Sequence, residues 1–99
     1  MILYRVTIIL QPGMEIEWIN WMQQVHIPDV IRTGCFEQCR MFRELEASEP
    51  SYVLEYQCRS LEDYHRYREQ HAPTLQKEHT DRYAGRFRGT RQLLECLSS

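Results

Sequence analysis

Residues 2–10 read ILYRVTIIL and residues 52–58 read YVLEYQC, and in both stretches apolar side chains alternate with more polar ones. An alternation with a period of two is typical of a β-strand that is buried on one face. We expect the even-numbered residues of both stretches to face the core. Two such strands indicate a sheet with one covered face and one open face.

An amphipathic helix is predicted between these strands, after the turn at Pro12 and Gly13. Its apolar residues recur at helical spacing and are Met14, Trp18, Trp21, Met22 and Val25. We expect this helix to end or bend near His26, because Pro28 disfavours helical geometry at the residue before it. Residues 29–33 would then form a turn that leads to Gly34.

A second helical segment is predicted after Ser60, which is a suitable N-cap residue followed by acidic residues. Its inward-facing ridge consists of Tyr64, Tyr67, His71, Leu75, His79 and Tyr83. Pro73 interrupts the segment, because a proline removes one backbone donor and clashes with the preceding turn. We expect a second helix kinked at Pro73, or two abutting helices over about 61–71 and 73–84.

Two further strands are predicted, from residue 35 to about residue 45 and over residues 87–97. The adjacent apolar residues Met41 and Phe42 blur the alternation of the earlier one, so we expect a bulge or an edge position there. The element order is βαββαβ. It predicts an α+β, ferredoxin-like sandwich that forms a single domain over residues 1–99. The four-stranded antiparallel sheet would have the spatial order 4-1-3-2, with the helices on one face.

The composition argues against several classes of function. The chain of 99 residues has a formal net charge of -2, and its basic residues are scattered, so no nucleic acid partner is expected. No apolar stretch approaches the roughly 20 residues of a membrane helix, so no membrane partner is expected either. The cysteines are expected within strands, as reduced thiols, which favours a cytoplasmic protein. They are Cys35, Cys39, Cys58 and Cys96.

No metal and no other cofactor is expected. The cysteines form no CxxC pair, and the compact ligand candidates are His71, Glu78 and His79. The two histidines are two helical turns apart, whereas a metal site needs three or more converging ligands. No glycine-rich phosphate loop and no GxSxG motif occurs.

Two similar segments, His26-Ile27-Pro28 and His71-Ala72-Pro73, carry the candidate chemistry. A neutral imidazole accepts a proton near physiological pH, so His26 is the candidate general base. Asp29, three positions further on, is the candidate group that orients His26 or binds a substrate donor. We expect His26 and His71 to line one cavity between the helices and the sheet. The other predicted ligand-binding residues are His79, Tyr4, Tyr56 and Trp21.

These residues fit two functions, and the sequence leaves open whether the chain is an enzyme. The first is an enzyme without a cofactor that acts on a small aromatic or acyl compound. The second is a non-enzymatic homodimeric module that binds a small-molecule ligand or regulates a partner. In the second, the histidine rings hydrogen-bond carbonyls at helix ends and both His-x-Pro segments are structural.

WMQQVHIPDVIRTGCFEQCRMFR at residues 21–43 and YREQHAPTLQKEHTDRYAGRFRGTRQLLE at residues 67–95 together resemble DUF4286, a family of small bacterial proteins of unknown function. More distantly, a helix that ends in HxP and leads through a turn to a glycine and a strand resembles the dimeric α+β barrel superfamily. That superfamily includes antibiotic-biosynthesis monooxygenases and ethyl tert-butyl ether degradation proteins. The resemblance implies a ferredoxin-like subunit and a homodimer joined through the sheet, and it assigns no reaction.

Overall fold

Four antiparallel strands form the sheet of the computed structural model, which describes residues 1–99, in the order β2-β3-β1-β4. β1 (Ile2–Leu10) is central and pairs with β3 (Ser51–Cys58) and with β4 (Phe87–Glu95). β2 (Gln38–Arg43) lies at one edge, next to β3. This order confirms the predicted ferredoxin-like topology and the edge position of the second strand.

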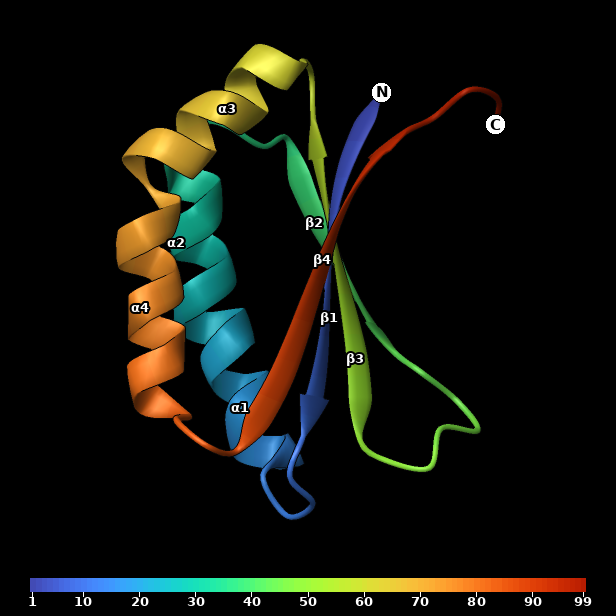
Figure 1. The fold of residues 1–99 in the computed structure, drawn as a ribbon, viewed down its shortest axis with the longest axis vertical. Coiled ribbons are helices and arrows are strands. Elements are labelled where there is room, and N and C mark those ends of the chain that lie inside the picture. Colours follow the sequence, from blue (N-terminus) through green and yellow to red (C-terminus); the bar gives the residue numbers. More distant parts are fainter.

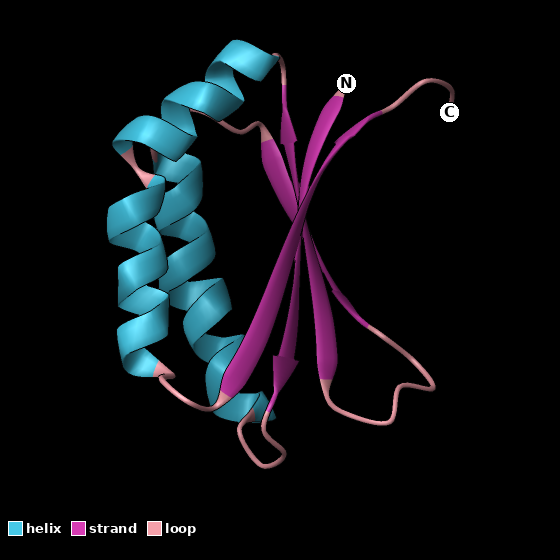
Figure 2. Ribbon diagram, in the orientation of Figure 1, coloured by secondary structure: helices cyan, strands magenta, loops and turns pink.

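The helices cover one face of this sheet, and the opposite face carries none (Figures 1 and 2). The helical elements are α1 (Glu15–Trp21), the π-helical turn η1 (Met22–His26), α2 (Ile27–Arg32), α3 (Leu61–Gln70) and α4 (Ala72–Arg82). None of them combines the length and the apolar character that crossing a bilayer requires. The fold is therefore a two-layer α+β sandwich, as predicted.

The core lies between the helices and the sheet, where the alternation of the strands predicted it. The even-numbered residues of β1 and β3 that are buried are Ile2, Tyr4, Ile8, Leu10, Tyr52, Leu54, Tyr56 and Cys58. Trp18 of α1 is fully buried, and its ring centroid lies 5.0 Å from that of Tyr52. A buried aromatic side chain removes about 150–250 Å² from water, so such contacts dominate the stability of a core this small.

The helical run of residues 15–32 continues through Pro28 with a π-helical irregularity that ends at His26, so the helix does not end there and the turn predicted at 29–33 is wrong. The Ile27 N–H donates to the Met22 carbonyl, five residues back, which widens this turn to a π-helix. Pro28 then lies in the first turn of α2, where its missing N–H leaves no helical bond unmade. The wider turn thus accommodates the proline without ending the helix.

Helices α3 and α4 abut at His71, whose backbone (φ −125°, ψ −39°) is not helical. α3 begins at the predicted N-cap, where the Asp63 N–H donates to the Ser60 hydroxyl at 3.2 Å. Pro73 lies in the first turn of α4, where a proline needs no N–H partner. The chain therefore changes direction at His71, and α4 returns alongside α2 (Figure 1).

The edge strand β2 is shorter than predicted, because Cys35 and Phe36 are buried in the loop before it. β4 ends at Glu95, so Cys96 also lies outside a strand. The prediction that each cysteine lies within a strand is therefore wrong for Cys35 and Cys96. All four cysteines are free thiols.

Candidate functional site

A small cavity lies between the helices and the sheet, with a volume of about 40 Å³. A space of this size holds about one or two water molecules. Its apolar wall includes Val6, Ile8 and Leu54 from the sheet. Its polar lining includes His26, His79, Tyr4, Tyr56, Tyr67 and Arg91. The cavity therefore combines an apolar wall with a few polar groups, which is typical of a small-molecule site.

Two histidines meet in this cavity, one from each helical run. The ring of His26, at the end of η1, lies with its centroid 5.8 Å from the ring of His79 on α4. Burial lowers the pKa of His26 to about 4, and the nearby Asp29 only partly opposes this effect. Burial, followed by the charges of His26 and Arg91, lowers the pKa of His79 to about 4. Both imidazoles are therefore neutral at pH 7.

The two rings differ in their hydrogen bonds. Trp18 Nε1 donates to His79 Nε2 at 2.9 Å, so Nε2 is an acceptor and the neutral ring of His79 carries its proton on Nδ1. His26 Nδ1 is buried and has no hydrogen-bond partner. A buried polar atom without a partner costs about 1–3 kcal/mol. His79 is thus held by the core, whereas His26 has a nitrogen free to bond a ligand.

Trp21 lies beside the cavity and does not line it. Its ring centroid is 5.3 Å from that of His26 and 5.9 Å from that of His79. The Arg82 guanidinium lies over the Trp21 ring, 5.2 Å from its centroid. Trp21 therefore packs against the rings of both histidines without lining the cavity. Of the predicted site residues, Tyr4, Tyr56, His26 and His79 line the cavity itself.

Asp29 and His71 lie outside this cavity. The Asp29 carboxylate forms an ion pair with Arg32. Asp29 and His71 line a separate, shallow hollow at the surface, between α2 and the start of α4. Asp29 accepts no hydrogen bond from His26. No contact therefore supports the prediction that Asp29 orients this ring.

The prediction that His26 and His71 share one cavity is wrong. The two helical runs point in opposite directions, so the start of α4 lies beside α2 (Figure 1). His71 therefore lies near Asp29. His79, about two turns further along α4, lies beside His26 instead.

Arg91 and Tyr67 also line the cavity, and neither is among the predicted site residues. Arg91 pairs with Val6 of β1, and paired residues of antiparallel strands point to the same face. Phe87, Gly89, Arg91 and Leu93 share the face that the helices cover, but β4 has no regular alternation of apolar and polar residues that would mark this face in the sequence. Arg91 and Phe87 both line the cavity.

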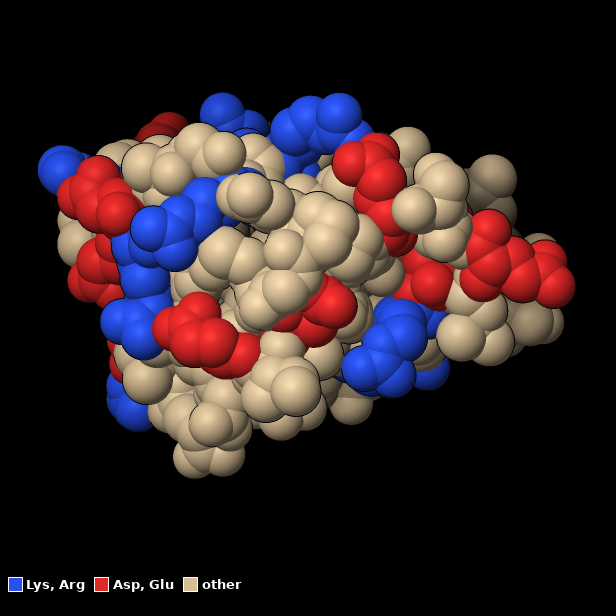
Figure 3. Space-filling model, turned by 90° about the horizontal axis from the view of Figure 1, so that it is seen from below, with Lys and Arg blue, Asp and Glu red and all other residues tan.

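No group of three or more His, Cys, Asp or Glu side chains converges in a way that could hold a metal ion. The ionisable groups of the surface are mixed in sign. Figure 3 shows basic and acidic side chains next to one another on the end of the molecule that it presents.

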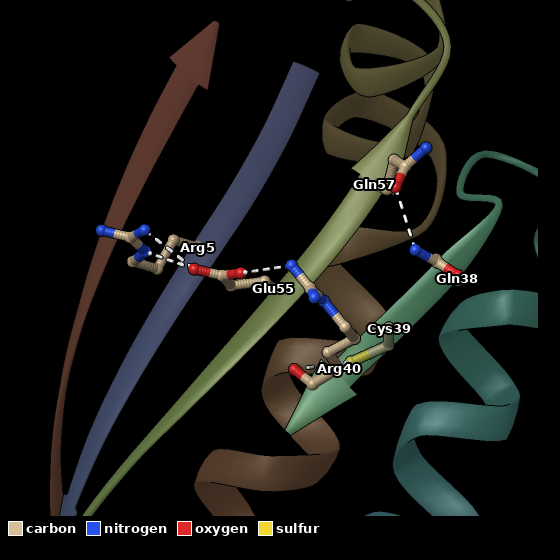
Figure 4. Close-up of polar contacts among 6 residues, drawn as sticks. All are labelled: Arg5, Gln38, Cys39, Arg40, Glu55 and Gln57. Atoms are coloured by element: carbon tan, nitrogen blue, oxygen red, sulfur yellow. Dashed lines mark hydrogen bonds and ion pairs between the residues drawn. The ribbon is translucent and has the colours of Figure 1, made fainter. Parts of the chain in front are cut away.

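The open face of the sheet carries a polar network. Arg5 donates through Nε and Nη2 to Glu55 Oε2, at 3.0 Å and 2.8 Å. Arg40 Nη2 reaches the other oxygen of the same carboxylate at 3.4 Å, and the side chains of Gln38 and Gln57 bond at 3.0 Å (Figure 4). The Glu55 side chain is 12% exposed. This face thus buries most of a carboxylate between two guanidinium groups.

Solved structures similar to this chain share its fold. SnoaB, a cofactor-independent oxygenase from Streptomyces nogalater, has a TM-score of 0.75 and 16% identity, and the match covers 99% of this chain and 95% of that chain. A dimeric ferredoxin-like protein from an uncultured marine organism has a TM-score of 0.75 and 12% identity, with the same coverages. An antibiotic biosynthesis monooxygenase has a TM-score of 0.69 and 11% identity, covering 99% of this chain and 100% of that one.

At these identities the likeness establishes the fold alone. No curated protein matches the chain. The sequence model of the family described as "Domain of unknown function (DUF4286)" matches residues 1–97. The match covers nearly the whole chain and confirms the resemblance in the sequence, so the protein belongs to the DUF4286 family.

Proposed function

We propose that the chain is an enzyme that binds a small aromatic or acyl compound in the cavity and removes a proton from it, with His26 as the general base. The observation that carries this proposal is the buried Nδ1 of His26, which has no partner within the chain. A lone pair kept in a largely apolar cavity is suited to accept a proton from a bound molecule. The reaction needs no cofactor, and one structural neighbour is named a cofactor-independent oxygenase.

In the proposed step, the substrate is an acyl compound with a C–H bond next to its carbonyl group. His26 accepts the proton, and the electron pair of the broken C–H bond passes to the carbonyl oxygen to give an enolate. Where the substrate is β,γ-unsaturated, the imidazolium returns the proton to the γ carbon as the double bond moves into conjugation with the carbonyl group. This completes an isomerisation in which atoms and charges balance. Tyr4 and Tyr56 line the same cavity, and their hydroxyl groups are donors suited to the enolate oxygen.

The low pKa of His26 makes it a weak base in the empty cavity. An enolate formed nearby favours the charged imidazolium, so the pKa rises as the reaction proceeds. The cavity must also widen to admit a ring, because its volume of about 40 Å³ is too small for one. Gln76 and Thr80 of α4 lie at its lining and are not fully buried, so their side chains are free to change rotamer.

The test measures proton removal directly. Acetophenone is incubated with the protein in D₂O at pH 7.5, and proton NMR follows the exchange of its methyl protons. We expect the wild type to accelerate exchange at least about tenfold, which is below the usual contribution of general base catalysis. His26→Leu should abolish the acceleration, and the control His71→Ala should keep it. Equal rates with and without protein, or an active His26→Leu variant, would overturn the proposal.

A second candidate is a ligand-binding module without turnover. The pKa of about 4 at both histidines supports it, because such imidazoles are weak bases at pH 7. Binding of acetophenone without any exchange of its methyl protons would favour this candidate.

We further propose that the chain forms a homodimer through the open face of the sheet. Support comes from the structural neighbour named a dimeric ferredoxin-like protein and from the absence of helices on this face (Figure 2). Size exclusion with light scattering should give the mass of a dimer at micromolar concentration, and a monomer mass would contradict the proposal. A cytoplasmic location is part of the same proposal, and the four free thiols support it.

A further inference from the structure

Arg91 is the only side chain lining the cavity that carries a charge at pH 7, because the lining contains no Lys, Asp or Glu and both histidines are neutral. It lies on β4 opposite Val6, on the face of the sheet that the helices cover. The apolar wall thus faces one guanidinium and no carboxylate.

The charge of Arg91 is also unpaired. Seven other arginines form ion pairs with acidic side chains: Arg5, Arg32, Arg40, Arg59, Arg66, Arg82 and Arg88. Arg91 forms none and is exposed to solvent; Arg43, Arg68 and Arg86 also lack an ion pair, but none of these three lines the cavity. A guanidinium is an apt donor for a carboxylate, which it can bind through two parallel hydrogen bonds. The guanidinium of Arg91 is therefore free to pair with an anionic group of a ligand in the cavity.

The Tyr4 hydroxyl lies near this guanidinium. Burial raises the pKa of Tyr4, and the charge of Arg91 opposes that rise. The phenol therefore stays protonated at pH 7 and is a second donor on the same side of the cavity. Arg91 and Tyr4 together offer donors to one anionic group, and His26 lines the same cavity.

We propose that Arg91 and the Tyr4 hydroxyl anchor a single negative charge on the ligand, so that the site selects monoanionic aromatic or acyl compounds, above all carboxylates. This inference rests on the proposed function, since it names the substrate class of the same cavity. A single charge matches the single guanidinium that lines the cavity. A dianion would leave its second charge in a largely apolar cavity, which is unfavourable without a partner.

The test compares benzoate with benzamide, which has nearly the same shape and no charge. Proton–nitrogen NMR titrations measure the dissociation constant of each probe from shifts of residues around the cavity. We expect the wild type to bind benzoate at least about tenfold more tightly than benzamide. Arg91→Gln should remove this preference, by lowering the benzoate affinity at least about tenfold. Arg88→Gln is the matched control, because it removes an arginine from the same strand but from the open face, and it should keep the preference.

A second measurement in the same samples is the pH titration of the imidazole signals. Bound benzoate should raise the midpoints of His26 and His79, whereas benzamide should not. Equal affinities of the wild type for the two probes would overturn the anchor and leave the cavity as a binding site. Binding of neither probe would overturn both the anchor and the proposed function. A benzoate preference that survives in Arg91→Gln would assign the anion to another residue and overturn the anchor.

Discussion

The two His-x-Pro segments of the chain have similar sequences and different structures. His26-Ile27-Pro28 lies within an unbroken helical run, and His71-Ala72-Pro73 lies where two helices abut. In each case the proline falls in the first turn of the helix that follows it. The difference arises from the preceding turn: a π-helical hydrogen bond from Ile27 to Met22 continues the helix, whereas the extended φ of His71 ends it.

This difference decides which histidine reaches the cavity. His26 has a buried ring nitrogen beside His79, and His71 lines a shallow hollow at the surface. A short motif therefore fixes where a proline can lie, while the backbone hydrogen bonds upstream of it fix where the histidine points. Substitutions at His26 and at His71 should therefore differ in their effects on stability and on its pH dependence.

The largest expected effect is a loss of stability in acid. The folded-state pKa of His26 and of His79 is about 4, below the value of about 6.5 in an unfolded chain, so the folded state favours the neutral rings. Their contribution is complete above about pH 6.5 and is lost as the pH falls toward 4. It amounts to about 3 kcal/mol for each histidine. Urea unfolding at pH 7 and pH 4 measures the difference.

The double variant His26→Leu/His79→Leu is the control for this effect, because carboxylates also titrate over the lower part of this range. It should show a clearly smaller loss between the two pH values. His71→Ala should lose as much as the wild type. An unchanged pH dependence in the double variant would mean that the two rings are not held neutral by burial.

Replacing His79 by leucine should cost about 1–3 kcal/mol at pH 7. The substitution leaves Trp18 Nε1 buried without its acceptor. In a double-mutant cycle with Trp18→Phe, the second substitution should cost less in the His79→Leu background than in the wild type. Simple additivity of the two losses would show that the hydrogen bond contributes nothing to stability.

Replacing His26 by leucine should leave stability unchanged or raise it by about 1 kcal/mol. The substitution removes a buried nitrogen that has no partner and keeps an apolar side chain against Trp21. Urea unfolding at pH 7 measures the change. A loss of more than about 2 kcal/mol would mean that the ring supports the helix, as the structural interpretation of the motif requires.

The smallest effect is expected for His71→Ala, which should change the free energy of unfolding by less than about 0.5 kcal/mol. The His71 side chain is partly exposed at a surface hollow and makes no hydrogen bond. The same unfolding measurement compares it with His26→Leu. A loss as large as that of His79→Leu would remove the contrast between the two segments.

The sequence predicted the fold well because the decisive patterns are local. The alternation in β1 and β3 specifies a buried face, and Ser60 specifies where α3 begins. The path through Pro28 could not be predicted in this way, since proline in the first turn of a helix and proline after its end have the same local signature. The hydrogen bond from Ile27 to Met22 distinguishes them, and no residue type demands it.

The site was predicted only in part for a related reason. Tyr4, Tyr56 and His79 follow from the periodicity of their own strand or helix, and they line the cavity. Arg91 does not, because nothing in an isolated stretch indicates that a charged residue of an edge strand faces the helices. Its place depends on pairing with Val6, some 85 residues earlier in the chain.

The π-helical turn at Met22–His26 makes the site sensitive to chain length in a way that the rest of α1 and α2 is not. A π-turn contains one residue more than the α-helical turn that it replaces. Deletion of a single exposed residue such as Gln23 would restore regular α-helix and rotate everything on one side of it by about 100° relative to the other. Trp18 and Val30, both almost fully buried, could then not face the core together. Homologues should therefore conserve the number of residues between these two positions more strictly than the identity of those residues.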